Sequence, residues 1–424
     1  MITNSVRLGV FRDRPVFEAA EFGEIIVPAH IAAYAGDGLW GFLQGFAAEQ
    51  SRRDRLFRYD PMTYLLYIPR RYWLRESAQD DQSDDDPVSP SDLKPALKAM
   101  LEAYELLEPA VLRSLTAARQ EFVSNGAARC LRFQRRGSEA ATSGTIAKYA
   151  RLLGRSVDGV LAPSRLVAPY TAIEPWSGQG LVDQIALNTG TLDERQAGEA
   201  VWAVLALTGN MRPLSPADLD RLQLRSFDGV ALWAGGMDEY SASSVTLRGY
   251  RQLISGLGMP VWLMFGGYFS LLLADDGAVD VSHGIYYTES KLVRGAVGGG
   301  PAPDRYYIPR LHRFYDPARA FAILRLLPEY ECSCVECGDV ETLESQLVAA
   351  SRDTALRIAW TQRLQRHFLA ARAQEVRAAS SSERAALLQD LRTTVREIGS
   401  VPATRRSSAG LSDTHLQSWI EALE

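Results

Sequence analysis

The chain has 424 residues, 46% of them hydrophobic, and a formal net charge of −5. This length is enough for one large core plus a smaller appended unit. A nucleic-acid binder is usually basic overall, so any such contact here must come from a local basic segment. No apolar run approaches the roughly 20 residues that cross a bilayer, and the first residues lack the apolar core of a signal peptide. We therefore expect a soluble, cytoplasmic protein without membrane contact.

The N-terminal part contains two apolar runs and one acidic segment. Residues 23–34 predict a strand followed by a loop, and residues 62–69 predict a second strand just after Asp60. Residues 77–92 are acidic, rich in Ser and Pro and almost free of apolar side chains, which is typical of a mobile surface insertion. A helix is expected to follow this segment and to continue to about residue 124.

Beyond residue 145, apolar strands alternate with helices. Parallel strands buried between helices give this pattern, and the number of units in one block favours a closed barrel over an open sheet. The predicted fold is α/β, a (β/α)8 TIM-type barrel, in which chemistry sits at the C-terminal ends of the strands. The expected helices cover 145–154, 192–200, 215–225, 246–258 and 269–277, and the expected strands cover 158–163, 201–209, 227–236, 260–267 and 279–287.

Three of the four cysteines, Cys332, Cys334 and Cys337, fall within six residues. Thiolates suit zinc, and structural zinc sites take four tetrahedral ligands. The fourth ligand must come from elsewhere, and His367 on a predicted later helix can supply it. The alternatives are three small residues in an apolar core, or a redox pair formed by Cys334 and Cys337. The remaining cysteine, Cys130, is expected to be buried.

These patterns predict three regions along the chain. Residues 1–327 are expected to form the barrel, with the acidic insertion at 77–92. Residues 328–375 are expected to form a zinc-binding subdomain, and residues 376–424 a C-terminal helical tail. Loops are expected at 378–384 and 400–410, before a last helix at 412–423. In the helix that carries His367, the residues Trp360, Leu364 and Phe368 are expected to face inward.

Three of these features resemble the tRNA-guanine transglycosylase family, which includes archaeosine enzymes and relatives that act on DNA. They are the Cys-x-Cys-x-x-Cys segment with a His on a later helix, the Gly-Gly end of 227–236, and the order of 260–267 and 279–290. The resemblance covers residues 145–375 and, in less detail, 23–75. It implies a barrel with one structural zinc ion that acts on bases in nucleic acid. If the helix is matched to the family through Phe368, the position of the fourth zinc ligand falls on Leu364 instead of His367.

The resemblance also implies functional positions, several of which carry a different type of residue here. The family's nucleophilic Asp falls on His283, and Asp280 is the nearest carboxylate. Three residues apart on a strand, these two would lie on opposite faces unless a bulge intervened. The base-recognising positions fall near Ser164 and Thr208, and Asp60 is the counterpart of a catalytic Asp on an early strand.

Each of these residues also has an ordinary structural interpretation. Gly235 and Gly236 would lie against the bound base, or would simply form a turn. His283 can be a hydrogen-bonded residue of the core or rim, and Asp280 a capping or ion-paired residue. Asp60 precedes a proline, which is common where a turn begins.

Seven basic residues fall between 291 and 325 and are interleaved with aromatic side chains, a pattern that suits phosphate contacts and base stacking. Lys291, Arg294, Arg310 and Arg313 are the candidates for contacts with tRNA or DNA. The alternative is a solvated face whose arginines pack on aromatic rings.

The leading hypothesis is a divergent transglycosylase-like protein that acts on a nucleobase or an N-glycosidic bond in RNA or DNA. Asp60 would be the base, with Asp280 or His283 opposite the anomeric carbon of the ribose. The first alternative is a catalytically silent zinc-containing barrel that binds nucleic acid or a partner, as a homo- or hetero-oligomer. The second is a small-molecule enzyme on the same barrel.

Overall fold

The protein is seen in a computed structural model. It describes most of the chain, including all of the C-terminal part. The described residues are 2–9, 14–18, 22–33, 39, 42–43, 57–67, 73–74, 86–107, 113–140, 163–173, 179–208, 215–285 and 304–424.

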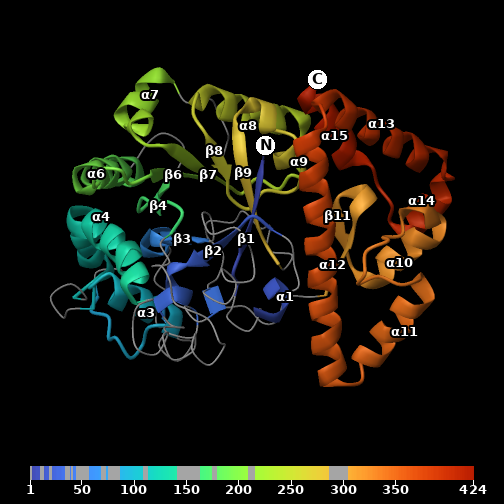
Figure 1. Ribbon diagram of the computed structural model, residues 1–424, viewed down its shortest axis with the longest axis horizontal. Helices are drawn as coiled ribbons and strands as arrows, with labels where there is room; N and C mark the ends of the chain where they lie inside the picture. Colours follow the sequence, from blue (N-terminus) through green and yellow to red (C-terminus); the bar gives the residue numbers. More distant parts are fainter. Residues whose placement is uncertain are drawn as a thin grey trace.

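Eight parallel strands form a nearly closed barrel with helices around it (Figure 1). The order around the sheet, β3-β2-β1-β9-β8-β7-β6-β4, follows the order along the chain, as a (β/α)8 fold requires. The short strand β5 pairs with β6 farther along than β4 does. The strands are β1 Thr3–Arg7, β2 Glu24–Pro28, β3 Phe57–Asp60, β4 Leu166–Val167, β5 Ala172–Ile173, β6 Val201–Thr208, β7 Gly229–Gly235, β8 Val261–Leu263 and β9 Ala278–Gly284.

The seam between β3 and β4 is bridged just before β4 begins. The backbone N–H of Ser164 donates to the carbonyl of Phe57 at 2.8 Å, and the hydroxyl of Ser164 hydrogen-bonds the carboxylate of Glu24 on β2. These contacts join the two ends of the sheet order, so the predicted α/β barrel is confirmed.

The barrel strands alternate between an interior face and a face covered by helices. One buried cluster joins Ile26 of β2 with Trp202 of β6 and Trp262 of β8. Because β2 and β6 lie far apart in the sheet order, these side chains can meet only inside the barrel. The neighbouring residues of β6, Ala203 and Leu205, belong to a second cluster that includes the buried face of α8. Strands buried on both faces explain the continuous apolar runs in the sequence.

Helices surround the barrel on the outside, as Figure 1 shows for α6, α7 and α8. Helix α7 starts with a capping box, in which Ser215 and Asp218 satisfy each other's backbone N–H groups. Among the described residues, no helix is both long and apolar enough to cross a membrane. The helices of this part are α1 Arg14–Glu18, α3 Pro95–Ala103, α4 Leu115–Ala140, α6 Gln179–Glu194, α7 Pro216–Arg221, α8 Ser244–Leu257 and α9 Tyr268–Leu271.

The C-terminal region consists of a two-stranded antiparallel hairpin and six helices that pack beside the barrel (Figure 1). The long helix α12 runs next to the barrel, where the ring of Phe368 contacts that of His283 at 5.1 Å. The buried indole of Trp419 in α15 donates to the carbonyl of Glu239 at 2.8 Å. The elements are β10 Tyr306–Ile308, β11 Arg313–Tyr315, α10 Pro317–Leu326, α11 Val340–Ala350, α12 Thr354–Ser381, α13 Arg384–Ser400, α14 Ala403–Ala409 and α15 Thr414–Leu423.

Several predicted elements differ from the structure in the N-terminal part. Residues 29–33 are helical where a loop was expected. The strand predicted at 62–69 is wrong, because β3 ends at Asp60 and Thr63–Tyr67 forms a 3₁₀ helix. The single helix expected to reach about residue 124 is instead two helices, α3 and α4. Residues 77–85 of the predicted insertion lie outside the described residues.

Later elements agree better with the sequence. The strands expected at 201–209, 227–236, 260–267 and 279–287 are present as β6 to β9. The helix expected at 192–200 is wrong, because α6 ends at Glu194. The loop expected at 400–410 is wrong as well, because it contains α14. The helix predicted at 145–154 and most of the strand at 158–163 lie outside the described residues.

Candidate functional site

Four potential metal ligands come together between a loop and helix α12. The cysteines lie in the segment between α10 and α11, where the backbone N–H of Cys337 donates to the carbonyl of Cys334 and closes a turn. His367 lies near the middle of α12. One ligand atom from each of Cys332, Cys334, Cys337 and His367 lies within 4.8 Å of all the others. The structure therefore brings together all four residues predicted from the sequence.

The distances within this group fit a tetrahedral metal site. The Nδ1 atom of His367 lies 3.4 Å from the Sγ of Cys334 and 3.1 Å from that of Cys337, and these two sulfurs are 3.5 Å apart. A tetrahedral zinc with sulfur bonds of about 2.3 Å would separate two sulfurs by about 3.8 Å. Three thiols and one imidazole are a donor set for a structural metal, and the four residues present could hold one.

Residues of the hairpin orient His367. Its Nε2 atom lies 2.6 Å from the carbonyl oxygen of Tyr307, so this nitrogen carries the proton and Nδ1 is left to bind a metal. The ring of Tyr306 stacks on the imidazole at 4.6 Å, and its hydroxyl lies 3.3 Å from the Sγ of Cys337. Such partners around the ligands set the tautomer and the ring orientation in metal sites.

The members of this group share protons, so the pKa values of Cys334 and Cys337 move in opposite directions. Hydrogen bonds from Cys332 and Cys337 lower the pKa of Cys334. Burial opposes the charged form of His367, but hydrogen bonds to Cys332 and Cys334 raise its pKa to about 9. The arrangement thus supports one thiolate, at Cys334, and a bound metal would take the place of the proton on Nδ1 of His367.

The structure also bears on the alternatives for these residues. The three cysteines are partly exposed, which does not fit three small residues in an apolar core. Leu364 is buried in the core cluster, whereas His367 faces the sulfurs. Cys130 is buried as predicted, and burial raises its pKa to about 12, so it is an unreactive thiol at neutral pH.

A second polar group lies at the C-terminal ends of the strands, around Asp60. Its carboxylate, fully buried at the end of β3, accepts hydrogen bonds from Arg7 at the end of β1 and from the hydroxyl of Tyr170 at 2.8 Å. The backbone N–H of Met62 donates to it at 2.9 Å. Burial opposes the charge on Arg7, but Asp60 raises its pKa. The two residues therefore form an ion pair at the end of the barrel where chemistry is expected.

Aromatic rings surround this ion pair. The ring of Tyr64 stacks on Tyr170 at 5.8 Å and meets Trp233 edge-on at 4.6 Å. Trp233 contacts Phe265 at 5.1 Å, and the guanidinium of Arg7 lies over Phe265 at 5.1 Å. Sequence analysis found Asp60 but missed this set. The one available signal was the position of Trp233 on an apolar strand.

Asp280 lies inside the barrel, in a separate ion cluster. Its carboxylate accepts from the hydroxyl of Ser5 at 2.9 Å and pairs with Arg58. The other side of the Arg58 guanidinium lies 3.5 Å from Glu24, and Trp262 stacks over it at 3.6 Å. The register of β8 and β9 shifts between Ala278 and Asp280, before the stretch from Asp280 to Gly284 that pairs regularly with β1. Burial raises the pKa of Asp280 and Arg58 opposes that change.

His283 points out of the barrel, toward α12. Its ring is fully buried, with Nε2 at 2.8 Å from the side-chain oxygen of Asn4 and Nδ1 at 3.0 Å from the carbonyl of Gly284. Burial lowers its pKa to about 3. The structure therefore confirms that Asp280 and His283 lie on opposite faces of the strand. It does not bring Asp60, Asp280 and His283 into one group.

The predicted base-recognising residues lie at different ends of the barrel. Ser164 precedes β4 and contacts Glu24 at the start of β2, so its predicted position at the C-terminal end of a strand is wrong. Thr208 and Gly235 pair with each other at the C-terminal ends of β6 and β7. Gly236 has φ = +80° and open space where a Cβ would be, so a turn conformation, not close packing, requires glycine there.

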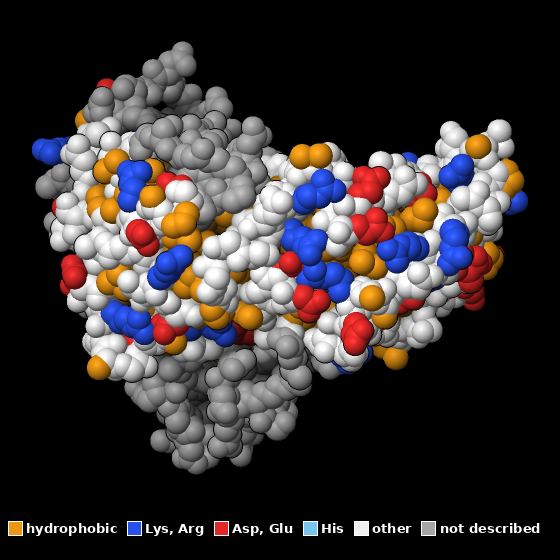
Figure 2. Space-filling view, turned by 90° about the horizontal axis from the view of Figure 1, so that it is seen from above, with side chains coloured by type: hydrophobic (Ala, Val, Ile, Leu, Met, Phe, Trp, Pro, Cys, Tyr) orange, Lys and Arg blue, Asp and Glu red, His pale blue; other side chains and the backbone are white. Residues whose placement is uncertain are grey.

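Part of the predicted nucleic-acid segment can be described. Lys291 and Arg294 lie outside the described residues. Arg310 contacts the carboxylate of Glu397 at 3.4 Å, and the guanidinium of Arg313 lies over the rings of Tyr240 and Tyr315. In Figure 2, basic side chains alternate with acidic ones over the helical part of this face. The structure does not test whether any of them contacts nucleic acid.

No protein-family model matches the chain, and no curated protein matches it. Function must therefore be argued from the residues themselves.

Proposed function

We propose that this protein is a divergent transglycosylase-like enzyme that acts on the N-glycosidic bond of a nucleobase in RNA or DNA, with Asp60 as its central residue. The observation that carries the proposal is the position of the Asp60 carboxylate at the C-terminal end of the barrel strands, held by Arg7, Tyr170 and the N–H of Met62. Strand ends of this kind are where barrel enzymes place catalytic groups.

The hydrogen bonds to Asp60 suit a role as an anion. Arg7 places a positive charge beside the carboxylate, and Tyr170 and the N–H of Met62 donate to it. When an N-glycosidic bond breaks, positive charge develops on the sugar, and a fixed carboxylate stabilises that charge. Asp60 would face the anomeric carbon, and Arg7 and Tyr170 would position it.

The aromatic rings suit a planar substrate. Tyr64 and Phe265 are only partly buried and border the Arg7–Asp60 pair. Aromatic side chains stack on every type of nucleobase, because each base has a flat π face. This favours a nucleobase over a purely aliphatic small molecule.

We also propose that the metal held by the four-ligand group is zinc, in a structural role. Three thiolates and one imidazole in a closed set are typical of structural zinc. When bound, the metal would link the cysteine segment to α12 and supply folding free energy. The same group is one of the features through which the sequence resembles the transglycosylase family.

The experiment is a base-release assay on RNA and on DNA with purified wild type, Asp60→Asn and Asp193→Asn. Asp193 lies exposed on α6 and serves as the matched control. Wild type and the control should release a base, and Asp60→Asn should lose activity by about a hundredfold or more, as expected for a charge that acts in the transition state. Equal activity of Asp60→Asn and wild type would reject the proposed role, provided that both proteins melt at similar temperatures.

A second candidate function is a silent barrel that only binds nucleic acid. It is favoured by the positions of Asp280 and His283, whose side chains contact other groups than Asp60 does. Only one of the three candidate catalytic side chains, that of Asp60, is left at the C-terminal ends of the strands. In that case wild type binds RNA or DNA in a salt-dependent way but releases no base from either.

A further inference from the structure

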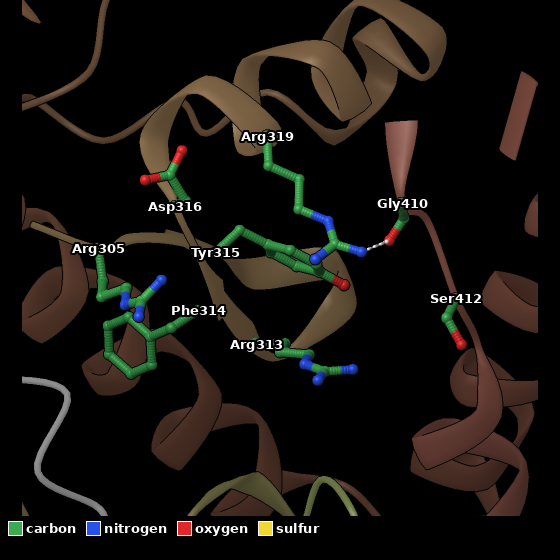
Figure 3. Close-up of a pocket in the computed structure, with 8 residues that line it drawn as sticks. All are labelled: Arg305, Arg313, Phe314, Tyr315, Asp316, Arg319, Gly410 and Ser412. Carbon is green, nitrogen blue, oxygen red and sulfur yellow. Dashed lines mark hydrogen bonds between the residues drawn. The ribbon is translucent and has the colours of Figure 1, made fainter. Parts of the chain in front are cut away.

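A pocket of about 410 Å³ opens in the C-terminal region, and none of its lining residues belongs to a barrel strand (Figure 3). It lies between the β10–β11 hairpin, the first turn of α10 and the segment that joins α14 to α15. The lining residues are Arg305, Arg313, Phe314, Tyr315, Asp316, Arg319, Gly410 and Ser412.

The lining is strongly basic. It contains three arginines and one carboxylate, that of Asp316, which caps α10 by accepting the N–H of Ala318 at 3.1 Å. Arg319 donates to the carbonyl of Gly410 at 2.8 Å. Within the described part of the chain, neither Arg313 nor Arg319 forms an ion pair, whereas Arg310 and Arg325 do. The two charges are therefore left for a ligand.

Tyr315 supplies a second, independent feature. It is 5% exposed, and its hydroxyl has no hydrogen-bond partner among the described residues. Its ring lies between Arg313 and Arg319, 5.7 Å and 5.9 Å from their guanidinium carbons. Figure 3 shows the hydroxyl between these two side chains, on the side of the pocket that Gly410 and Ser412 form. A buried hydroxyl without a partner costs free energy unless a ligand satisfies it.

We infer that this pocket binds the phosphate group of a phosphorylated ligand, with Arg313, Arg319 and the hydroxyl of Tyr315 as its donors. Guanidinium groups match the oxygens of phosphate with paired hydrogen bonds, and charge-assisted bonds of this kind are the strong ones. The volume exceeds that of one phosphate, so the ligand is a nucleotide-sized molecule or one phosphate of a nucleic-acid chain. The inference does not depend on the reaction proposed at Asp60.

The test is calorimetric titration of the full-length protein with inorganic phosphate, with AMP and with a short single-stranded RNA, in a phosphate-free buffer of low salt. Wild type should bind inorganic phosphate saturably. Arg313→Gln combined with Arg319→Gln should weaken binding by about a hundredfold, because two charge-assisted contacts are lost. Arg325→Gln is the matched control, since Arg325 lies on the same helix but pairs with Glu344, and it should bind as wild type does.

The variant Tyr315→Phe separates binding from folding. It keeps the ring but removes the unpartnered hydroxyl, so phosphate affinity should fall about tenfold while the melting temperature of the free protein stays the same or rises. No saturable phosphate binding by wild type, or unchanged affinity in both the double variant and Tyr315→Phe, would overturn the inference.

The other ligands identify the source of the phosphate. If RNA binds and inorganic phosphate competes with it, the pocket holds a phosphate of a nucleic-acid chain. If AMP binds more tightly than inorganic phosphate while RNA does not compete, the ligand is a small phosphorylated molecule. Both results support a phosphate site, and neither requires base release by the barrel.

Discussion

His283 and His415 are buried histidines outside the metal group, each about 1% exposed or less. Burial lowers the pKa of each to about 3, whereas an unfolded chain has a value of about 6.5. Between these values the unfolded chain binds protons that the folded chain does not. Both groups therefore stabilise the fold above pH 6.5, and this contribution is lost progressively as the pH falls toward 3.

We predict that the free energy of unfolding falls by about 1.4 kcal/mol per pH unit for each of these histidines below pH 6.5. Urea titrations of wild type and His283→Gln at pH 7 and pH 5 measure this effect. The variant should be less stable at pH 7 but less sensitive to acid. Metal loss at low pH affects both proteins, so the difference between them isolates His283. An identical pH dependence would contradict the prediction.

Residues that act within one short segment could be predicted from the sequence, whereas residues assembled from distant segments could not. The three cysteines lie close together in the chain, and their chemistry needs a fourth ligand, so His367 could be found. The Arg7–Asp60–Tyr170 group comes from three separate elements. Only the closed sheet brings its members together.

At the scale of elements, the polar interior of the barrel explains why strand β3 was missed. Strand β3 has the sequence FRYD, and its polar residues Arg58 and Asp60 point inward to partners on other strands. A pattern of apolar residues alone does not predict such a strand. The segment TYLLY has the composition of a strand but forms a 3₁₀ helix, in which the hydroxyl of Thr63 donates to the carbonyl of Tyr170.

For a similar reason, the predicted helix lay too far along the chain, at 192–200, whereas α6 covers Gln179–Glu194. Its buried face includes Asp183, Gln184, Asn188 and Thr191 as well as leucines. Gln184 and Asn188 bond backbone groups of neighbouring segments, and Thr191 donates to the carbonyl of Leu187 within the helix. For example, Asn188 donates to the carbonyl of Leu222 at 2.6 Å. The hydrophobic periodicity that marks a helix is therefore weak here.

Strands β1, β2, β3 and β9 are joined through Arg58, and its removal should be costly. We predict that Arg58→Met destabilises the protein by about 3–5 kcal/mol, because the carboxylates of Asp280 and Glu24 stay buried without their cation. Chemical denaturation measures this. Combining the change with Asp280→Asn should recover part of the loss. A cost below about 1 kcal/mol for Arg58→Met would show that the cluster is solvated.

At the scale of the whole molecule, the positions of the candidate residues in the barrel bear on whether the protein can exchange guanine into tRNA. Guanine exchange into tRNA requires a carboxylate that forms a covalent link to the sugar and polar groups that read the base. Here His283 faces α12, and Ser164 lies at the opposite end of its strand from the expected one. Asp60 stands alone among the three candidates at the C-terminal strand ends.

We therefore predict that the protein does not incorporate guanine into tRNA and that its product is a released base. An assay with labelled guanine and tRNA measures incorporation. Robust incorporation by wild type would show that the assignment of these positions is wrong and that a carboxylate reaches the sugar in another way.

Within the C-terminal region, the metal group would link the segment between α10 and α11 to the middle of α12. Structural zinc contributes folding free energy directly. Removal of the metal by a chelator should therefore lower the melting temperature. His367→Ala should weaken metal retention, whereas His312→Ala should not, because His312 pairs with Glu375 at 2.6 Å and lies outside the group.

The metal content of the purified protein is the most direct measurement of whether Cys332, Cys334, Cys337 and His367 act as one site. Elemental analysis of wild type should give about one zinc per chain, as a single four-ligand group requires, and Cys334→Ser should hold much less. Wild type that folds and binds no metal, even after refolding with zinc present, would contradict the assignment of this centre.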